Sequence, residues 1–344
     1  MARPFDAPSA ARVPALHALS TDTRAALALA AAALLWAGNF IAGRALRDEI
    51  SPATLNLLRW ALCLVIFLPW VGAKVWRYRC VVARDWRLLL GLGATGIAAF
   101  HTMVYVALTS TTAINALLML SLAPTTILVG AALTGGSRPS RPQWAGTLVS
   151  LVGACILVTH GSLATLLALT PARGDLWMIA AVMVWAVYSL LLRRRPADLP
   201  HDVALAASIV PAIALLLPVV TLTAVAAPVA LTPRALAMLI YIAVFASLIA
   251  FLLWSYGVSH IGPERAGQFV HLMPVFGALL AVVLLGESIV LPQVAGALCV
   301  FAGMALVQRG ARLPAGPAEP KRWRAPDSHE KRRLEAAQRN VQLR

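Results

Sequence analysis

The chain has 344 residues, of which 60% are hydrophobic and only 12% are charged. Soluble domains contain about 45–50% apolar and about 25% charged residues. Because so few charged side chains cannot cover a water-exposed surface, the composition excludes a soluble globular protein and indicates an integral membrane protein. The formal net charge of +15 does not predict a nucleic-acid partner, because Lys and Arg lie between the apolar runs and in the tails, not along a basic amphipathic stripe.

Ten apolar runs follow one another along the chain. A helix needs about 20 apolar residues to cross about 30 Å of hydrocarbon, and continuous runs favour helices over the alternating strands of a barrel. The seventh run contains Pro211 and Pro218, which predict a kink. We expect an all-α integral membrane fold with ten transmembrane helices, at residues 25–43, 52–73, 88–108, 112–134, 143–160, 174–192, 203–227, 235–258, 265–285 and 291–308.

The basic residues are distributed unevenly between the two sides of this predicted bundle. If the N-terminus is cytoplasmic, 24 of the 29 Lys and Arg residues fall in cytoplasmic segments, four fall on the opposite side, and Arg59 lies inside a span. Positive residues concentrate in cytoplasmic loops, so both termini are predicted to be cytoplasmic. The alanine-rich, lysine-poor composition is typical of a GC-rich bacterial genome, and we expect a bacterial cytoplasmic (inner) membrane.

The two halves of the chain match each other at a constant offset of 150 residues. Seven identities fall within thirty ungapped positions, at Pro124/Pro274, Gly136/Gly286, Pro142/Pro292, Gln143/Gln293, Ala145/Ala295, Gly146/Gly296 and Gly153/Gly303. Trp36 matches Trp185 at an offset of 149. Each half holds five spans, so the second must enter the membrane inverted, an arrangement common in secondary transporters. We predict a cytoplasmic N-terminal tail at 1–24, a first repeat at 25–160 and a linker at 161–173. A second repeat follows at 174–308 and a basic cytoplasmic tail at 309–344.

Several motifs resemble the EamA-type family of the drug/metabolite transporter superfamily. The second half carries Pro274, Gly286-Glu287, Pro292-Gln293, Gly296 and Gly303, and the first two spans carry Leu35-Trp36-Ala37-Gly38-Asn39-Phe40 and Asn56-Leu57-Leu58-Arg59-Trp60. The resemblance covers about residues 26–308 and implies ten helices in two EamA-like repeats that export or take up small solutes. The first repeat has Gly136-Ser137 where the second has Gly286-Glu287, so any role of Glu287 is not duplicated.

Arg59 is the charged residue that lies deepest in a predicted span. It is about eight residues from the outer end of the second span, roughly 12 Å deep at 1.5 Å per residue. A charged side chain at that depth costs at least about 2.5–3.5 kcal/mol, so it is a candidate for function. A fixed cation would bind a carboxylate or phosphate of the substrate. The alternative is a structural role, holding carbonyls or an acidic side chain of a neighbouring helix.

Two histidines inside the spans are candidates for proton coupling. His271 shares a helix face with Gln268 at i, i+3 spacing, and its repeat partner Ser121 is also polar. The ordinary pKa of histidine lies near operating pH, which suits a proton relay. The alternative for His271 is a packed side chain bonded to another helix. For His101, in the third span, the plainer interpretation is a buried histidine with satisfied hydrogen bonds.

The remaining candidates are uncharged. Asn39, Trp36, Asn115 and Gln268 would line a substrate-binding cavity, although amides also join helices and aromatic residues also pack. Pro124 and Pro274 fall inside the predicted fourth and ninth spans and are candidate hinges, with a static kink as the alternative.

These features predict a secondary transporter, specifically an exporter, of a small polar metabolite such as an amino acid or derivative. The chain has no GxxxxGK[ST] phosphate-binding loop, so an ion gradient or exchange must drive transport, and we expect proton antiport through His271. We expect no cofactor or metal, because the four cysteines show no ligand spacing. The basic tail would bind anionic lipid, or remain solvated. The alternatives are a non-transporting scaffold or sensor, and an intramembrane enzyme, which the absence of a catalytic constellation disfavours.

Overall fold

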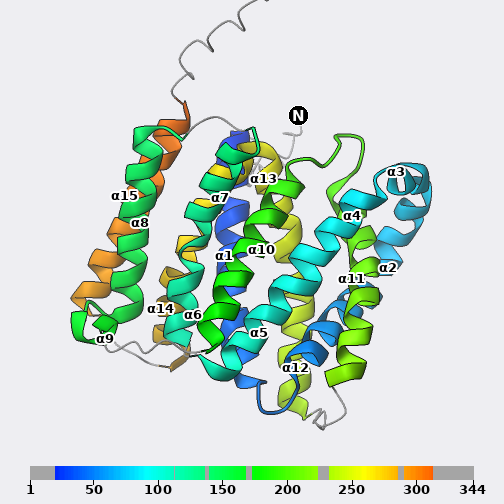
Figure 1. Ribbon diagram of the computed structural model, residues 1–344, viewed down its shortest axis with the longest axis horizontal. Coiled ribbons are helices and arrows are strands. Elements are labelled where there is room, and N and C mark those ends of the chain that lie inside the picture. Colours follow the sequence, from blue (N-terminus) through cyan, green and yellow to red (C-terminus); the bar gives the residue numbers. More distant parts are fainter. Residues whose placement is uncertain are drawn as a thin grey trace, which may run out of the picture.

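The computed structural model of the protein describes residues 20–111, 113–135, 139–167, 173–223, 232–285 and 290–312. All regular elements in these ranges are helices, packed side by side in a bundle (Figure 1). They are α1 (Thr21–Ala45), α2 (Pro52–Arg77), α3 (Arg79–Arg84), α4 (Trp86–Leu92), α5 (Phe100–Ser110), α6 (Ala113–Leu120), α7 (Ala123–Leu133), α8 (Arg141–Thr159), α9 (Leu163–Leu167), α10 (Arg173–Leu192), α11 (His201–Thr223), α12 (Pro233–Tyr241), α13 (Ala250–Gly267), α14 (Leu272–Leu285) and α15 (Leu291–Arg312). Two π-helical segments, η2 (Gly93–Ala99) and η4 (Ile242–Ile249), and one 3-10 segment, η5 (Gln268–His271), join neighbouring α-helices end to end.

Nine helical stretches in the described ranges are long and apolar enough to cross a bilayer. The prediction of an all-α integral membrane protein is therefore confirmed. One of the nine, Trp86–Ser110, is a single span because η2 joins α4 to α5 without a break. Another, Pro233–Leu280, has 48 residues, far more than one bilayer crossing needs.

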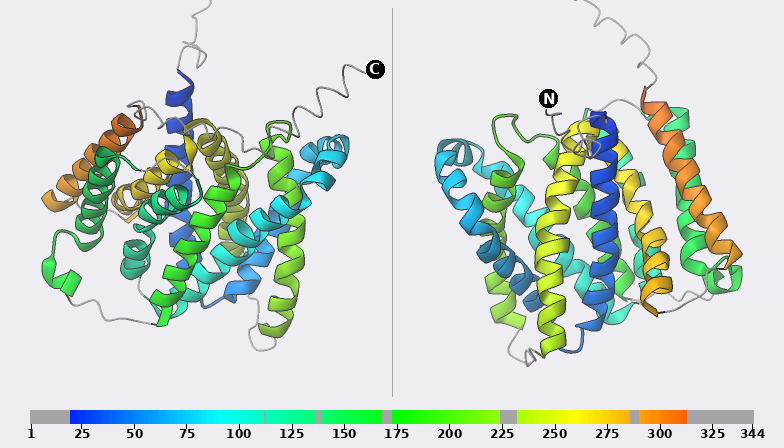
Figure 2. Two further views of the ribbon diagram at one scale, coloured as in Figure 1. Left: turned by 45° about the horizontal axis from the view of Figure 1, so that its top comes forward. Right: turned by 180° about the vertical axis from the view of Figure 1, so that it is seen from behind.

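The 48-residue stretch contains a reversal at Gly262. The backbone there has φ 79° and ψ 157°, a conformation that glycine adopts readily and other residues rarely do. Pro263 follows and cannot donate a backbone hydrogen bond, which prevents a regular helix from passing through. Figure 2 shows α13 and α14 running in opposite directions on either side of this point. The apolar runs predict a break between 258 and 265, in agreement with this reversal, and the count of ten spans stays a prediction.

The two candidate hinge prolines lie at the beginnings of helices, which corrects the prediction that the fourth span is one helix over 112–134. The structure ends α6 at Leu120 and begins α7 at Ala123, with Pro124 in the first turn of α7. Proline is tolerated there because the first N–H groups of a helix have no intrahelical partner. Pro274 likewise lies in the first turn of α14, directly after the 3-10 segment η5. Both spans are thus broken just before the proline.

Helices α8 and α15 pack closely along one edge of the bundle (Figures 1 and 2). Glycines make this approach possible. A Cβ atom at Gly146 would lie 2.5 Å from the carbonyl oxygen of Gly303, and one at Gly153 would lie 2.6 Å from that of Gly296. Gly296 is the counterpart of Gly146 at the 150-residue offset, and Gly303 is the counterpart of Gly153. Each glycine of α8 therefore contacts the counterpart of the other, and the two contacts are reciprocal. Ser150 Oγ donates to the carbonyl of Val300, again 150 residues away, at 3.1 Å.

The same pair of helices also begins in the same way. At the start of α8, the backbone N–H of Ser140 donates to the side chain of Gln143 at 2.8 Å. At the start of α15, the N–H of Val290 donates to the side chain of Gln293 at 3.1 Å. Such a bond satisfies an N–H group that the helix itself leaves unpaired. The repeated glutamine therefore serves as a helix-start signal in both halves.

Candidate functional site

The buried guanidinium of Arg59 connects four segments of the chain at the centre of the bundle. Arg59 lies on α2 and its side chain is fully buried. Its Nε donates to Ser247 Oγ on η4 at 2.8 Å. Its Nη1 donates to Tyr105 Oη on α5 at 2.8 Å and to Asn39 Oδ1 on α1 at 3.4 Å. Tyr105 Oη in turn donates to Asn39 Oδ1 at 3.1 Å. The position of the Arg59 guanidinium is therefore fixed by neutral hydroxyl and amide groups.

The positive charge of Arg59 has no acidic counterpart nearby. Among the described residues Arg59 takes part in no ion pair, and its Nη2 has no hydrogen-bond acceptor. The rings of Trp60 and Tyr105 lie 5.5 Å and 6.0 Å from its Cζ and provide weak cation–π attraction. A buried cation is normally paired, because desolvation is costly. This arrangement leaves the charge available to an anionic group.

A further hydrogen-bond donor near Arg59 has no acceptor in the described part of the chain. It is the indole N–H of Trp60, whose ring lies 5.5 Å from the Cζ atom of Arg59 and is completely buried. Buried polar groups usually have at least one partner. The unpaired Nη2 of Arg59 and the unpaired N–H of Trp60 match a ligand that supplies acceptors, such as a carboxylate or phosphate.

A small cavity lies beside this group of polar side chains. It is lined by Trp36, Asn39, Phe40, Phe100, His101, Val104, Leu120, Trp185, Val270 and Met273. Its volume is about 20 Å³, which is room for roughly one water molecule. Arg59 is not part of the lining and reaches the cavity through Asn39. A metabolite would fit only after the surrounding helices move apart.

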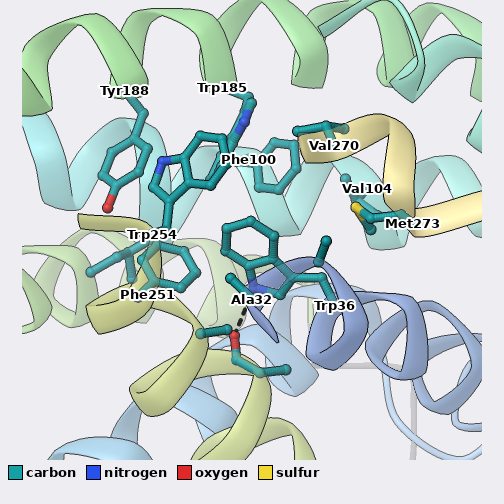
Figure 3. Packing of buried hydrophobic residues seen from close by; sticks show 14 of the residues in the cluster. Ala32, Trp36, Phe100, Val104, Trp185, Tyr188, Phe251, Trp254, Val270 and Met273 are labelled. Carbon is teal, nitrogen blue, oxygen red and sulfur yellow. Dashed lines mark hydrogen bonds between the residues drawn. The ribbon is translucent and has the colours of Figure 1, made fainter. Parts of the chain in front are cut away.

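Trp36, Phe100 and Trp185 line part of the cavity and belong to a cluster of packed aromatic rings, whose packing Figure 3 shows. Trp36 meets Trp185 edge to face with 5.2 Å between ring centroids, and it lies 5.4 Å from Trp254 and 5.7 Å from Phe251. The indole N–H of Trp36 donates to the carbonyl of Ala246 at 3.0 Å, which fixes the ring. A second cavity of similar size lies beyond these rings and is lined in part by Phe251 and His201. The rings therefore separate two spaces within the bundle.

His271 and Gln268 lie together at η5, apart from Arg59. His271 Nε2 is 2.9 Å from the carbonyl oxygen of Ser121, its repeat partner. A carbonyl only accepts, so Nε2 carries a proton and Nδ1 of the neutral ring is an acceptor. Gln268 donates to Thr147 Oγ1 at 3.1 Å. Neither His271 Nδ1 nor Gln268 Oε1 has a partner in the described ranges.

The structure thus divides the predicted site residues into groups. Trp36, Asn39 and His101 line one cavity and Arg59 lies directly behind Asn39, whereas Gln268 and His271 form a separate polar pair. His101 packs against Phe100 with 4.9 Å between ring centroids, and its Nδ1 has no hydrogen-bond partner in the described ranges. The side chain of Asn115 lies outside the described residues.

Two residues of the site, Tyr105 and Ser247, are not among the residues predicted from the sequence. The spacing of Tyr105 could have indicated it, because it lies one turn after His101 on α5 and the two residues therefore share a helix face. Ser247 offers no such signal, because a serine inside an apolar run is common and inexpensive. No group of three or more His, Cys, Asp or Glu side chains with metal-binding geometry occurs among the described residues.

Comparisons with known proteins agree with this architecture. An uncharacterized transporter of Archaeoglobus fulgidus is 26% identical over 269 residues, covering 78% of this chain and 91% of the relative. A protein of Streptantibioticus cattleyicolor named as a probable terminal-alkyne amino-acid exporter is 29% identical, covering 83% and 94%. A crystal structure of a protein with 23% sequence identity superposes with a TM-score of 0.67 over 84% of this chain and 98% of the other.

The match to a family extends over both halves of the chain. The sequence model of the EamA-like transporter family matches the chain twice, over residues 23–159 and 172–309. The two matches include the helices that carry Arg59, the aromatic cluster and His271. The chain belongs to the EamA-like transporter family.

Proposed function

We propose that this protein is a secondary exporter of a small polar metabolite that carries a carboxylate, such as an amino acid or derivative. The observation that carries the proposal is the fully buried Arg59, which has no acidic partner among the described residues and an unpaired Nη2. The exporter name of the S. cattleyicolor relative supports the same substrate class. The carboxylate would replace the missing counter-ion beside Asn39.

Transport would occur by alternating access between two inverted five-helix repeats. Residues related by a two-fold axis can touch their own equivalents only close to that axis. Three such contacts support the axis: His271 with Ser121, Ser150 with Val300, and the Trp36–Trp185 ring pair. The axis lies in the membrane plane in transporters of this build, so opening on one side accompanies closing on the other.

The two repeats would comprise ten spans with both termini in the cytoplasm of a bacterial cell. The reversal at Gly262 supports the division of the 48-residue stretch into two crossings. The charge distribution of the loops supports the orientation. The repeats then correspond to residues 25–160 and 174–308, as the sequence offset predicts.

Proton antiport would drive the export, with His271 as the coupling group. Its Nδ1 is a buried acceptor without a partner in the described ranges, and protonation there would add a charge at the break between η5 and α14. Ser121 lies at the matching break between α6 and α7. Protonation would therefore act where both broken spans meet.

Metabolite profiling of culture medium tests the proposed function. Cells would express the unaltered protein, Arg59→Gln, Arg59→Lys, or Arg47→Gln, an exposed arginine on a loop. We expect an amino-acid-like solute to accumulate outside with the unaltered protein and Arg47→Gln. Arg59→Gln should reduce its export about 10- to 100-fold, the equivalent of one charge-assisted hydrogen bond of about 1.5–3 kcal/mol. Arg59→Lys should retain part of the activity, since it keeps the charge but loses the planar fork.

Membrane levels of every variant would be matched by immunoblotting. Unchanged export by Arg59→Gln at equal membrane levels would overturn the role of Arg59. If the amounts of amino-acid-like solutes were the same in the medium of every culture, export of such solutes would be refuted. Uptake would then be the next hypothesis to test.

A further inference from the structure

An apolar groove lies on the outer surface of the bundle, where α2, α3 and α4 meet α11. Figure 1 shows these helices together at the end of the molecule where α1 begins. A groove of about 460 Å³ runs between them, within the size range of small-ligand sites. Val75, Trp86, Leu89 and Val210 are among its lining residues, which are all apolar. It is much larger than the two cavities inside the bundle, each of which has a volume of about 20 Å³.

The groove opens outward and has a defined shape. Trp86 is 54% exposed and Val210 is 58% exposed, so the groove faces the surroundings of the bundle rather than its interior. Its floor is a separate hydrophobic cluster that includes Leu89, Leu199 and Val203. Val75, Val82 and Ala207, which line the groove, pack against this cluster.

Two ion pairs hold the walls of the groove together. Lys74 on α2 binds Asp202 on α11 with 2.5 Å between Nζ and Oδ2. Arg84 on α3 binds Asp198, before α11, through both guanidinium Nη atoms at 2.9 Å and 3.0 Å. The hydrogen bonds from Arg84 keep the pKa of Asp198 below its ordinary value, so this carboxylate stays charged and paired. These acids are occupied and cannot neutralise the other basic residues of the rim.

Three arginines on the rim keep their positive charge exposed. Arg77, Arg79 and Arg87 are exposed and take part in no ion pair among the described residues. Arg87 Cζ lies 5.5 Å from the ring centroid of Trp86, which lines the groove. Arg79 Cζ lies 5.0 Å from the ring centroid of Trp76, next to the lining residue Val75. The apolar groove therefore ends beneath a cluster of free cations and exposed tryptophans.

We propose that this groove binds an anionic phospholipid, with an acyl chain in the groove and the phosphate at Arg79 and Arg87. The apolar lining fits hydrocarbon, the free arginines fit an anionic headgroup, and tryptophans are favoured at headgroup depth. A second copy of this chain would bring two sets of like charges together at the rim. In the orientation predicted from the loop charges the site lies in the cytoplasmic leaflet. This lipid site would be present whichever solute the protein transports.

Native mass spectrometry of the full chain in mild detergent tests the site. The protein would be titrated with phosphatidylglycerol or phosphatidylcholine of identical acyl chains. We expect phosphatidylglycerol to bind more tightly, and Arg79→Gln/Arg87→Gln to weaken it about fivefold per arginine. Arg44→Gln/Arg234→Gln is the matched control, since both arginines are exposed and belong to no ion pair in the described ranges. Ala207→Phe, which fills the groove, should weaken binding of both lipids.

Fluorescence provides a second measurement that does not require Ala207→Phe to fold. Brominated phosphatidylglycerol should quench the tryptophan emission of the unaltered protein more than brominated phosphatidylcholine does, and Trp86→Phe should remove most of that difference. Equal binding of the two lipids would overturn the proposal. So would an equal loss of binding in both arginine pairs, or unchanged quenching in Trp86→Phe.

Discussion

At the level of single residues, the position of Arg59 depends on hydroxyl groups more than on charge. Tyr105 accepts a hydrogen bond from Nη1 and donates one to Asn39, so it orients both groups. Tyr105→Phe conserves the volume but removes these bonds. We expect the apparent affinity for the exported solute to fall about 10-fold, the lower end for a hydrogen bond to a charged group. The concentration dependence of transport in proteoliposomes measures this, with Tyr256→Phe as a control away from Arg59.

His271 is expected to determine how transport depends on a pH gradient. In proteoliposomes, an imposed gradient should accelerate export by the unaltered protein several-fold. His271→Gln keeps a neutral, hydrogen-bonding side chain but cannot be protonated near neutral pH. It should lose the acceleration while retaining solute exchange. His260→Gln, an exposed histidine on α13, should behave like the unaltered protein. If His271→Gln responded fully to the gradient, proton coupling through His271 would be wrong.

The sequence predicts some of these residues much better than others. Arg59 and His271 attract attention because an ionisable side chain inside a span is costly. Tyr105 and Ser247 do not, because hydroxyl groups are common in membrane helices and their role arises only from three-dimensional proximity. The separation of His271 from Arg59 could not be predicted either, since it depends on how η5 packs against α7 and α8.

At the level of helices, the contact between α8 and α15 depends on having no side chain at four positions. Gly146→Leu would force its side chain against the carbonyl of Gly303. Overpacking of this kind costs about 1–3 kcal/mol, and the backbone contact leaves little room for relaxation. We expect a lower midpoint of thermal unfolding in detergent. Gly277→Ala is the control, because a Cβ atom there would meet nothing within 4 Å.

The reversal at Gly262 offers a second test at this level. Any other residue at φ 79° and ψ 157° is strained by roughly 1–3 kcal/mol. Gly262→Ala should therefore lower thermal stability by a similar amount, although the alanine side chain itself is small. An unchanged midpoint would mean that the turn between α13 and α14 adapts its backbone without cost.

The broken spans show where helix prediction from hydropathy loses detail. An apolar run predicts a crossing of the right length, but the interruption at Ser121 and Leu122 leaves the average apolarity unchanged. Pro124 signals it only indirectly, since a proline fits both a kinked helix and a helix start. The same applies to η5, where the 3-10 geometry has no compositional signature.

For the whole molecule, the predicted orientation can be measured with a native thiol. Cys80 on α3 is exposed and lies at the end where α1 begins, whereas Cys63 is buried. A membrane-impermeant thiol reagent should label Cys80 in inside-out vesicles and not in intact spheroplasts. A Cys80→Ser/Arg47→Cys variant should show the reverse. Labelling of Cys80 from outside would overturn the cytoplasmic placement of both termini.

The close packing of α8 against α15 has a signal in the sequence, because the two halves share the same rare residues at one offset. Gly146, Gly153, Gly296 and Gly303 recur at that offset, and in the structure they pack against each other as reciprocal pairs. The size of the central cavity could not be predicted in this way. It depends on the conformation in which Trp36 and its neighbouring rings are packed.

The glycine-lined contact between α8 and α15 also has a consequence for biogenesis. The first residue of α15 follows the last residue of α8 by 132 positions, so a ribosome working at about 5–20 residues per second makes α15 roughly 10 s later. During that interval Gly146, Ser150 and Gly153 face lipid or a chaperone instead of their partner. The contact is therefore incomplete until α15 enters the membrane, and a truncated product would display this small-residue face to the cell's membrane proteases.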